Sequence, residues 1–139
     1  MAKILLFILI GFGYATVAEA ENYCQATIYY FDWDTRTRAR LSIDDVREKY
    51  STKIHIQETT EITQFIESLP LEHMKTVEKP INSSSVDVRL VIDLLQCNGI
   101  VDSYYANRFN LNNLDGTKMV HIDEGFRNSF RIRIKWSER

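Results

Sequence analysis

Several side chains that could do chemistry lie close together in the stretch YFDWDTRTRAR. The stretch places a tryptophan between two carboxylates and follows them with arginines at every second position: Asp32, Trp33, Asp34, Arg36, Arg38 and Arg40. On an extended strand the two aspartates would share one face, with their Cα atoms about 7 Å apart. Catalytic carboxylate pairs in glycosidases are separated by about 5 to 10 Å, so acid–base catalysis is one interpretation of this stretch.

A recognition surface is the interpretation that we favour for the same residues. Ion pairs between the aspartates and the nearby arginines would account for the charges, and such exposed pairs stabilise a protein by less than about 1 kcal/mol. Tryptophan and arginine are also enriched among the residues that carry most of the binding energy of protein interfaces. We therefore predict a recognition edge with Trp33 as its anchor.

The histidines offer the other route to catalysis. His121 is the best candidate, because Asp123 and Glu124 follow it closely and could act with it in proton transfer. No two histidines stand at metal-ligand spacing, and the sequence has neither a Gly-x-Ser-x-Gly motif nor a glycine-rich phosphate loop. A small secreted hydrolase that uses His121 stays open as an alternative, and the sequence predicts no metal and no cofactor.

The start of the chain has the features of a secretory signal peptide. Lys3 precedes an apolar run over residues 4–12, and the small-x-small tripeptide AEA supplies a cleavage site. The apolar run is shorter than the ~20 residues of an ordinary membrane span, although an uncleaved N-terminal anchor remains an alternative. We predict a signal peptide over residues 1–20 and a single domain over residues 21–139, located in the periplasm or secreted, without an integral membrane span in the mature chain.

The two cysteines, Cys24 and Cys97, both lie in the exported part of the chain. Two thiols in an oxidising compartment most often pair with each other. There is no Cys-x-x-Cys motif and no histidine beside either cysteine, so neither a redox motif nor a zinc site is indicated. We predict one disulfide between Cys24 and Cys97.

Periodicity predicts an α+β fold, with a mostly antiparallel sheet of five or six strands and two helices packed on one face. Period-two patterns indicate strands at residues 25–33, 36–41, 53–57, 86–94, 100–106, 119–122 and 130–136. A cap at Ser42 and an apolar stripe from Ile62 to Leu69 predict helices over residues 43–50 and 60–69. The pair Asn98-Gly99 predicts a tight hairpin turn, and residues 110–117 read as a loop.

One face of the predicted sheet would gather aromatic and charged side chains. It would hold Tyr29, Phe31 and Trp33, the charged residues Asp87, Arg89 and Asp93, and the basic row Arg131, Arg133 and Lys135. The end of the predicted hairpin adds Tyr104, Tyr105, Asn107 and Arg108. This composition is typical of a protein-binding surface. Two alternatives remain open, namely that charge pairs only make this face soluble or that a helix covers its aromatics.

These observations together predict an exported, non-enzymatic binding protein that captures another protein. The formal net charge of −2 favours neither a nucleic acid nor another polyanion as the partner. Small, exported, disulfide-bridged chains without catalytic motifs include periplasmic inhibitors and immunity proteins, and we expect a role of that kind. A structural component of the cell envelope is a further alternative to the hydrolase.

Overall fold

The computed structural model describes residues 23–137 of the chain and the side chains of residues 23–131. The predicted signal peptide lies outside this range. Seven strands of the described range form one antiparallel sheet in the order β2-β1-β4-β5-β6-β7-β3. The strands are β1 (Tyr23–Tyr30), β2 (Thr52–Ile56), β3 (Lys75–Thr76), β4 (Leu90–Gln96), β5 (Val101–Ala106), β6 (Asn110–Asn113) and β7 (Lys118–His121).

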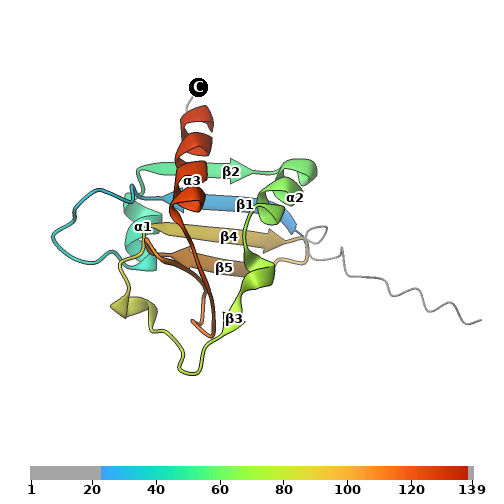
Figure 1. Ribbon diagram of the computed structural model, residues 1–139. Coiled ribbons are helices and arrows are strands. Elements are labelled where there is room, and N and C mark those ends of the chain that lie inside the picture. Colours follow the sequence, from blue (N-terminus) through green and yellow to red (C-terminus); the bar gives the residue numbers. More distant parts are fainter. Residues whose placement is uncertain (1–22, 138–139) are drawn as a thin grey trace, which may run out of the picture.

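The α-helices of the described range cover both faces of this sheet (Figure 1). Helices α2 (Thr59–Glu67) and α3 (Glu124–Ser137) lie on one face, and α1 (Ile43–Lys49) lies on the other. The α+β architecture with an antiparallel sheet is therefore confirmed. The two helices that share a face are α2 and α3, however, whereas the predicted pair was α1 and α2.

The hydrophobic core has two parts because the sheet is covered on both sides. The larger part lies between the sheet and helices α2 and α3, where the rings of Phe65 and Phe130 meet edge to face with their centroids 6.2 Å apart. The smaller part lies beneath α1 and contains Leu41, Val46, Val88, Val91 and Tyr105. Parts of the central strands are thus covered on both faces. The predicted exposed face of aromatic and charged residues does not exist there, since α1 and the chain around Leu41 cover it.

Local sequence signals account for helix α1. The Ser42 hydroxyl accepts a hydrogen bond from the backbone N–H of Asp45 (3.0 Å), and the Asp45 carboxylate accepts one from the backbone N–H of Ser42 (2.9 Å). This reciprocal pair is a capping box. The hydrogen bonds from Ser42 and from Lys49 lower the pKa of Asp45 to about 2. The predicted helix start at Ser42 is confirmed.

The other two strong local predictions are confirmed as well. Ile62 and Phe65 of α2 are buried, as the apolar stripe required. The hairpin between β4 and β5 turns at Asn98-Gly99, and Gly99 adopts a φ of 93°, which a residue with a side chain rarely adopts. Both signals depend on residues that are neighbours in the sequence, so they can be recognised without knowledge of the contacts made by the rest of the chain.

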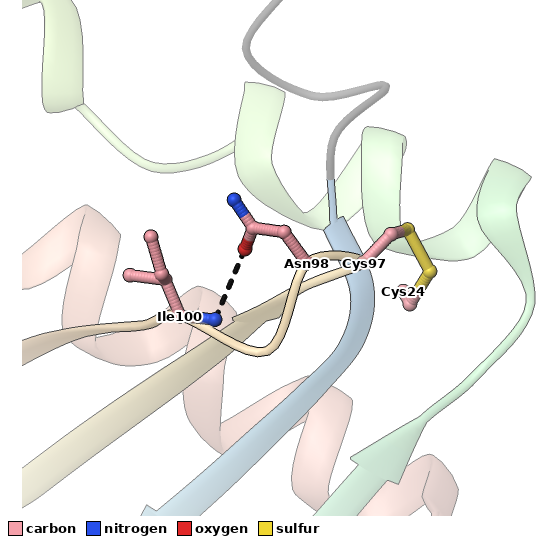
Figure 2. The surroundings of a disulfide bond; sticks show 4 residues. All are labelled: Cys24, Cys97, Asn98 and Ile100. Atoms are coloured by element: carbon pink, nitrogen blue, oxygen red, sulfur yellow. Dashed lines mark hydrogen bonds between the residues drawn. A yellow bond between two sulfur atoms is a disulfide. The ribbon is translucent and has the colours of Figure 1, made fainter.

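The predicted disulfide joins Cys24 of β1 to Cys97, which follows β4 (Figure 2). These adjacent antiparallel strands bring the two Cα atoms to 5.0 Å. Beside the bridge, the Asn98 side-chain oxygen accepts a hydrogen bond from the backbone N–H of Ile100 (3.0 Å) and closes the turn (Figure 2). A bridge across 73 residues of sequence should stabilise the fold by about 4 kcal/mol in the chain-entropy model.

The C-terminal segment is a helix, so the strand predicted over residues 130–136 is wrong. The Asp123 carboxylate accepts a hydrogen bond from the backbone N–H of Phe126 (2.8 Å), as the N-cap of a helix does. Phe126 and Phe130, four residues apart, place their ring centroids 4.9 Å from each other against the larger core. The basic row lies on α3 and not on the outer face of a strand: Arg131, Arg133 and Lys135.

Two further predictions in the irregular parts of the chain are wrong. Residues 110–117 are not all loop, because β6 pairs with both β5 and β7 and buries Leu111 in the larger core. That burial outweighs the low strand propensity of the neighbouring asparagines. Residues 36–41 form no strand and belong to a long loop over residues 31–42.

Candidate functional site

The loop over residues 31–42 carries most of the stretch that the sequence singled out, and it projects beyond the end of β1 (Figure 1). Both of its ends are fixed to the chain just before β4. The backbone N–H of Phe31 donates to the carbonyl of Arg89 (2.8 Å), and the carbonyl of Leu41 accepts from the backbone N–H of Val88 (2.9 Å). Its two ends are therefore held side by side at one point of the fold.

The Arg89 side chain clamps this loop from the inside and is only 2% exposed. Its Nη1 donates to the carbonyls of Asp32 (3.1 Å) and Thr35 (2.7 Å). Its Nε and Nη2 donate to the Asp87 carboxylate (3.1 and 2.8 Å). That carboxylate also accepts from the backbone N–H of Leu41 (3.0 Å). The ion pair between the buried Arg89 and the partly exposed Asp87 thus links the first half of the loop to the second.

Trp33 is a core residue, so the prediction that it anchors an exposed recognition edge is wrong. Its side chain is 0% exposed, and its ring stands edge to face against Tyr30 with 5.5 Å between the centroids. Strand β1 ends at Tyr30 and the chain turns at Trp33, so the strand alternation stops before it reaches the tryptophan. Burial also raises the pKa of Tyr30. Trp33 fastens the loop to the larger core.

The two aspartates of the loop take part in local structure rather than facing each other as a pair. The Asp32 carboxylate accepts a hydrogen bond from the backbone N–H of Asp34 (2.8 Å). The Asp34 carboxylate forms an ion pair with Arg131 of α3, so two of the predicted binding residues are in contact. This geometry gives the carboxylate-pair interpretation no support. The ion pair between Asp34 and Arg131 adds a further contact that holds the loop in place.

The turn between β5 and β6 lies across from the loop and is also held by side-chain hydrogen bonds. The Asn107 side-chain oxygen accepts from the backbone N–H groups of Phe109 (2.8 Å) and Asn110 (2.8 Å). Nη1 of Arg127, from α3, donates to the carbonyl of Arg108. The backbone of Arg108 and Phe109 is therefore fixed at both ends of the turn.

A cleft of about 520 Å³ lies between the loop and this turn. The described residues that line it include five arginines, namely Arg36, Arg38, Arg40, Arg89 and Arg108. Phe109 also lines the cleft, and 59% of its surface is exposed. Asp87 is the one carboxylate of this described lining, and Arg89 pairs with it. We call this site the arginine cleft.

Four arginines of the cleft have no carboxylate partner within residues 23–131: Arg36, Arg38, Arg40 and Arg108. Arg40 donates to the carbonyl of Ser85 (3.1 Å). Nε of Arg108 is buried and has no hydrogen-bond partner. A buried donor without an acceptor costs about 1 to 3 kcal/mol. The cleft thus carries an excess of guanidinium charge, which suits a carboxylate or a phosphate group.

Neither Tyr104 nor Tyr105, which were also predicted to bind, lines the cleft. Tyr105 is 0% exposed in the smaller core, so its predicted place on a recognition surface is wrong, and burial raises the pKa of its hydroxyl. Tyr104 is half-buried and packs against the larger core. The side chain of Arg133 lies outside the described residues.

His121, the residue of the alternative hydrolase, is exposed at the end of β7. Its Nδ1 lies 3.1 Å from the side-chain oxygen of Asn110. The Asp123 carboxylate caps α3, and Glu124 is the first residue of that helix. His121 is therefore paired with Asn110 rather than with either acid, and none of these residues lines the arginine cleft.

Comparisons with known proteins leave the geometry as the guide to function. No family model, curated protein or solved structure matches this chain. Among the described residues, no cluster of three or more histidine, cysteine, aspartate or glutamate side chains could hold a metal ion. No helix within residues 23–137 is long and apolar enough to cross a membrane.

Sequence reasoning missed the roles of Arg89 and the turn at Arg108. It placed both arginines among the residues of an exposed surface. Arg89 instead donates hydrogen bonds to carbonyl groups 54 and 57 residues away in the sequence. No local pattern reveals a contact of that range. Asn107 was the available signal for the turn, because asparagine side chains hydrogen-bond to the backbone two residues further on.

Proposed function

We propose that this protein is an exported, non-enzymatic binding protein that captures another protein through the arginine cleft. It acts in the periplasm or outside the cell, as an inhibitor or immunity-type protein that covers its partner's surface. The observation that carries this proposal is the presentation of Arg36, Arg38 and Arg40 on a loop that the buried Arg89 clamps.

The disulfide supports the compartment part of the proposal. Structural disulfides persist in oxidising compartments and are rare in the cytosol. The bridge between Cys24 and Cys97 fits a protein that leaves the cytosol, and so does the predicted signal peptide. A structural role in the envelope would need the same compartment but not a charged cleft.

The order of the loop supports the binding part of the proposal. Association loses free energy when loops and side chains must be ordered, and a loop already held in place loses less. Here Arg89, Trp33 and the Asp34–Arg131 ion pair hold the loop before any partner arrives. Exposed arginines on such a loop can also attract an acidic partner and speed the encounter.

Affinity capture tests the proposal directly. The immobilised full-length protein is incubated with the exported protein fraction of the cells that produce it, beside the triple variant Arg36→Gln, Arg38→Gln, Arg40→Gln. The wild type should retain a specific protein, and the variant should retain at least tenfold less of it, because the loss of one hot-spot residue costs about 2 kcal/mol or more and about 1.4 kcal/mol is already a tenfold change in affinity. Retention by wild type should fall as salt is added.

A matched control removes the same amount of charge elsewhere. Lys75, Lys79 and Lys118 are exposed and do not line the cleft. Changing all three to glutamine should leave retention within about twofold, since distant exposed charges are screened. Equal retention by the wild type and the arginine variant would place the contact elsewhere on the molecule and contradict the proposal.

A further inference from the structure

The arginine cleft carries more positive charge than its described surroundings neutralise. Arg89 and Asp87 pair with each other (2.8 Å), which leaves the other four arginines of the cleft, Arg36, Arg38, Arg40 and Arg108, without a carboxylate partner within residues 23–131. Guanidinium groups hold carboxylates through parallel N–H donors. The cleft is therefore complementary to negatively charged groups in closely spaced positions.

Arg108 and Phe109 give the cleft a chemical asymmetry. Arg108 has a fixed backbone and a buried Nε without an acceptor. Phe109 follows it and leaves 59% of its surface in water. A ligand with an acidic group beside an apolar one would match the positive charge of Arg108 and the exposed ring of Phe109 at once. Inorganic anions and sugar phosphates have no apolar group that could pack against Phe109.

The charge of the whole chain narrows the kind of ligand further. The formal net charge is −2, so the chain as a whole has no excess of positive charge to offer an extended polyanion such as a nucleic acid. A short acidic segment of a folded protein would touch the cleft alone. The volume of about 520 Å³ is in the range of sites that hold a small molecule or a few side chains.

We infer, on the basis of the proposed function, that the arginine cleft binds an acidic segment of the partner protein that also carries an apolar side chain. Arg108 holds one carboxylate of this segment through two parallel N–H donors. Arg36 and Arg38 on the loop contact neighbouring carboxylates, and Phe109 packs against the apolar side chain. Arg89 touches none of them and acts as a positioning residue for the loop.

The test uses a short fluorescent peptide that alternates glutamate with leucine, titrated against the full-length protein. Binding should saturate, and the same peptide with glutamine in place of glutamate should not bind. Arg108→Lys keeps the charge but loses the paired donors, so it should weaken binding by about tenfold. Arg36→Gln with Arg38→Gln should weaken it by a similar factor of about ten, while the Lys75, Lys79 and Lys118 control should change it by less than about twofold.

Several results would overturn the inference. Binding of the glutamine peptide as tight as that of the glutamate peptide would show that charge is not recognised. Full affinity in both arginine variants would place the peptide outside the cleft. Displacement of the peptide by inorganic phosphate, at an ionic strength matched with sodium chloride, would identify a phosphate site instead of a polypeptide site.

The peptide titration and the capture experiment separate the two proposals. If capture of a partner depends on Arg36, Arg38 and Arg40 but the glutamate peptide does not bind, the capture function is retained and the proposal of an acidic segment is rejected. Peptide binding that depends on Arg108, with no protein captured, would retain the acidic ligand and reject the capture function.

Discussion

Replacement of Trp33 by alanine should lower the free energy of unfolding by about 3 to 5 kcal/mol, the usual loss when a large aromatic side chain is removed from a core. Trp33 is fully buried and packs edge to face on Tyr30. The measurement is equilibrium unfolding in urea, with the slope of the transition compared between the variant and the wild type. An equal slope means that the change is one of stability alone.

Phe109→Ala is the control for this prediction, because Phe109 is a large aromatic with 59% of its surface exposed. It should change the free energy of unfolding by less than about 0.5 kcal/mol. A loss of less than about 1 kcal/mol for Trp33→Ala would contradict its place in the core. It would also restore the interpretation of Trp33 as an exposed anchor.

Arg89→Met should lower the free energy of unfolding by about 2 to 4 kcal/mol and loosen the loop over residues 31–42. Removing one member of a fully buried ion pair costs about 3 to 5 kcal/mol. Water can reach the partly exposed Asp87 when its partner is lost, so the expected loss extends somewhat below that range. The variant also leaves the carbonyls of Asp32 and Thr35 without their donor. Urea unfolding gives the stability, and amide hydrogen exchange in the loop gives its order.

The comparison for Arg89 is Arg38→Met, which changes the same side chain at an exposed position of the same loop. Its effect on stability should be less than about 0.5 kcal/mol. An Arg89→Met protein that unfolds at the wild-type urea concentration, with unchanged exchange in the loop, would show that the loop is held without the clamp. Arg89→Lys should restore little, because lysine cannot donate in four directions from a planar group.

Predictions that rest on neighbouring residues were correct. The cap at Ser42, the stripe of Ile62 and Phe65, and the turn at Asn98-Gly99 each depend on a few adjacent side chains. The C-terminal strand was wrong because a short apolar alternation fits more than one structure. Phe126 and Phe130 also stand at helical spacing, and the cap at Asp123 decides for the helix.

The candidate site could be predicted only in part. The sequence predicted Arg36, Arg38 and Arg40 as binding residues, and the structure places all three in the lining of the cleft. It assigned the anchor to Trp33 by extending a strand that ends at Tyr30. The opposite wall of the cleft, at Arg108, comes from a segment far away in the sequence. Only the pairing of β4 with β5 and of β1 with β4 brings these two segments together.

Amide hydrogen exchange of the complex with the captured protein tests the central claim most directly, because it locates the contact without altering the chain. The arginine cleft should become protected at residues 36–40 and 107–109. The hairpin turn at Asn98-Gly99 should exchange as in the free protein. Protection of the edge strand β2 or of α3, with none at residues 36–40 and 107–109, would contradict a partner site in the arginine cleft.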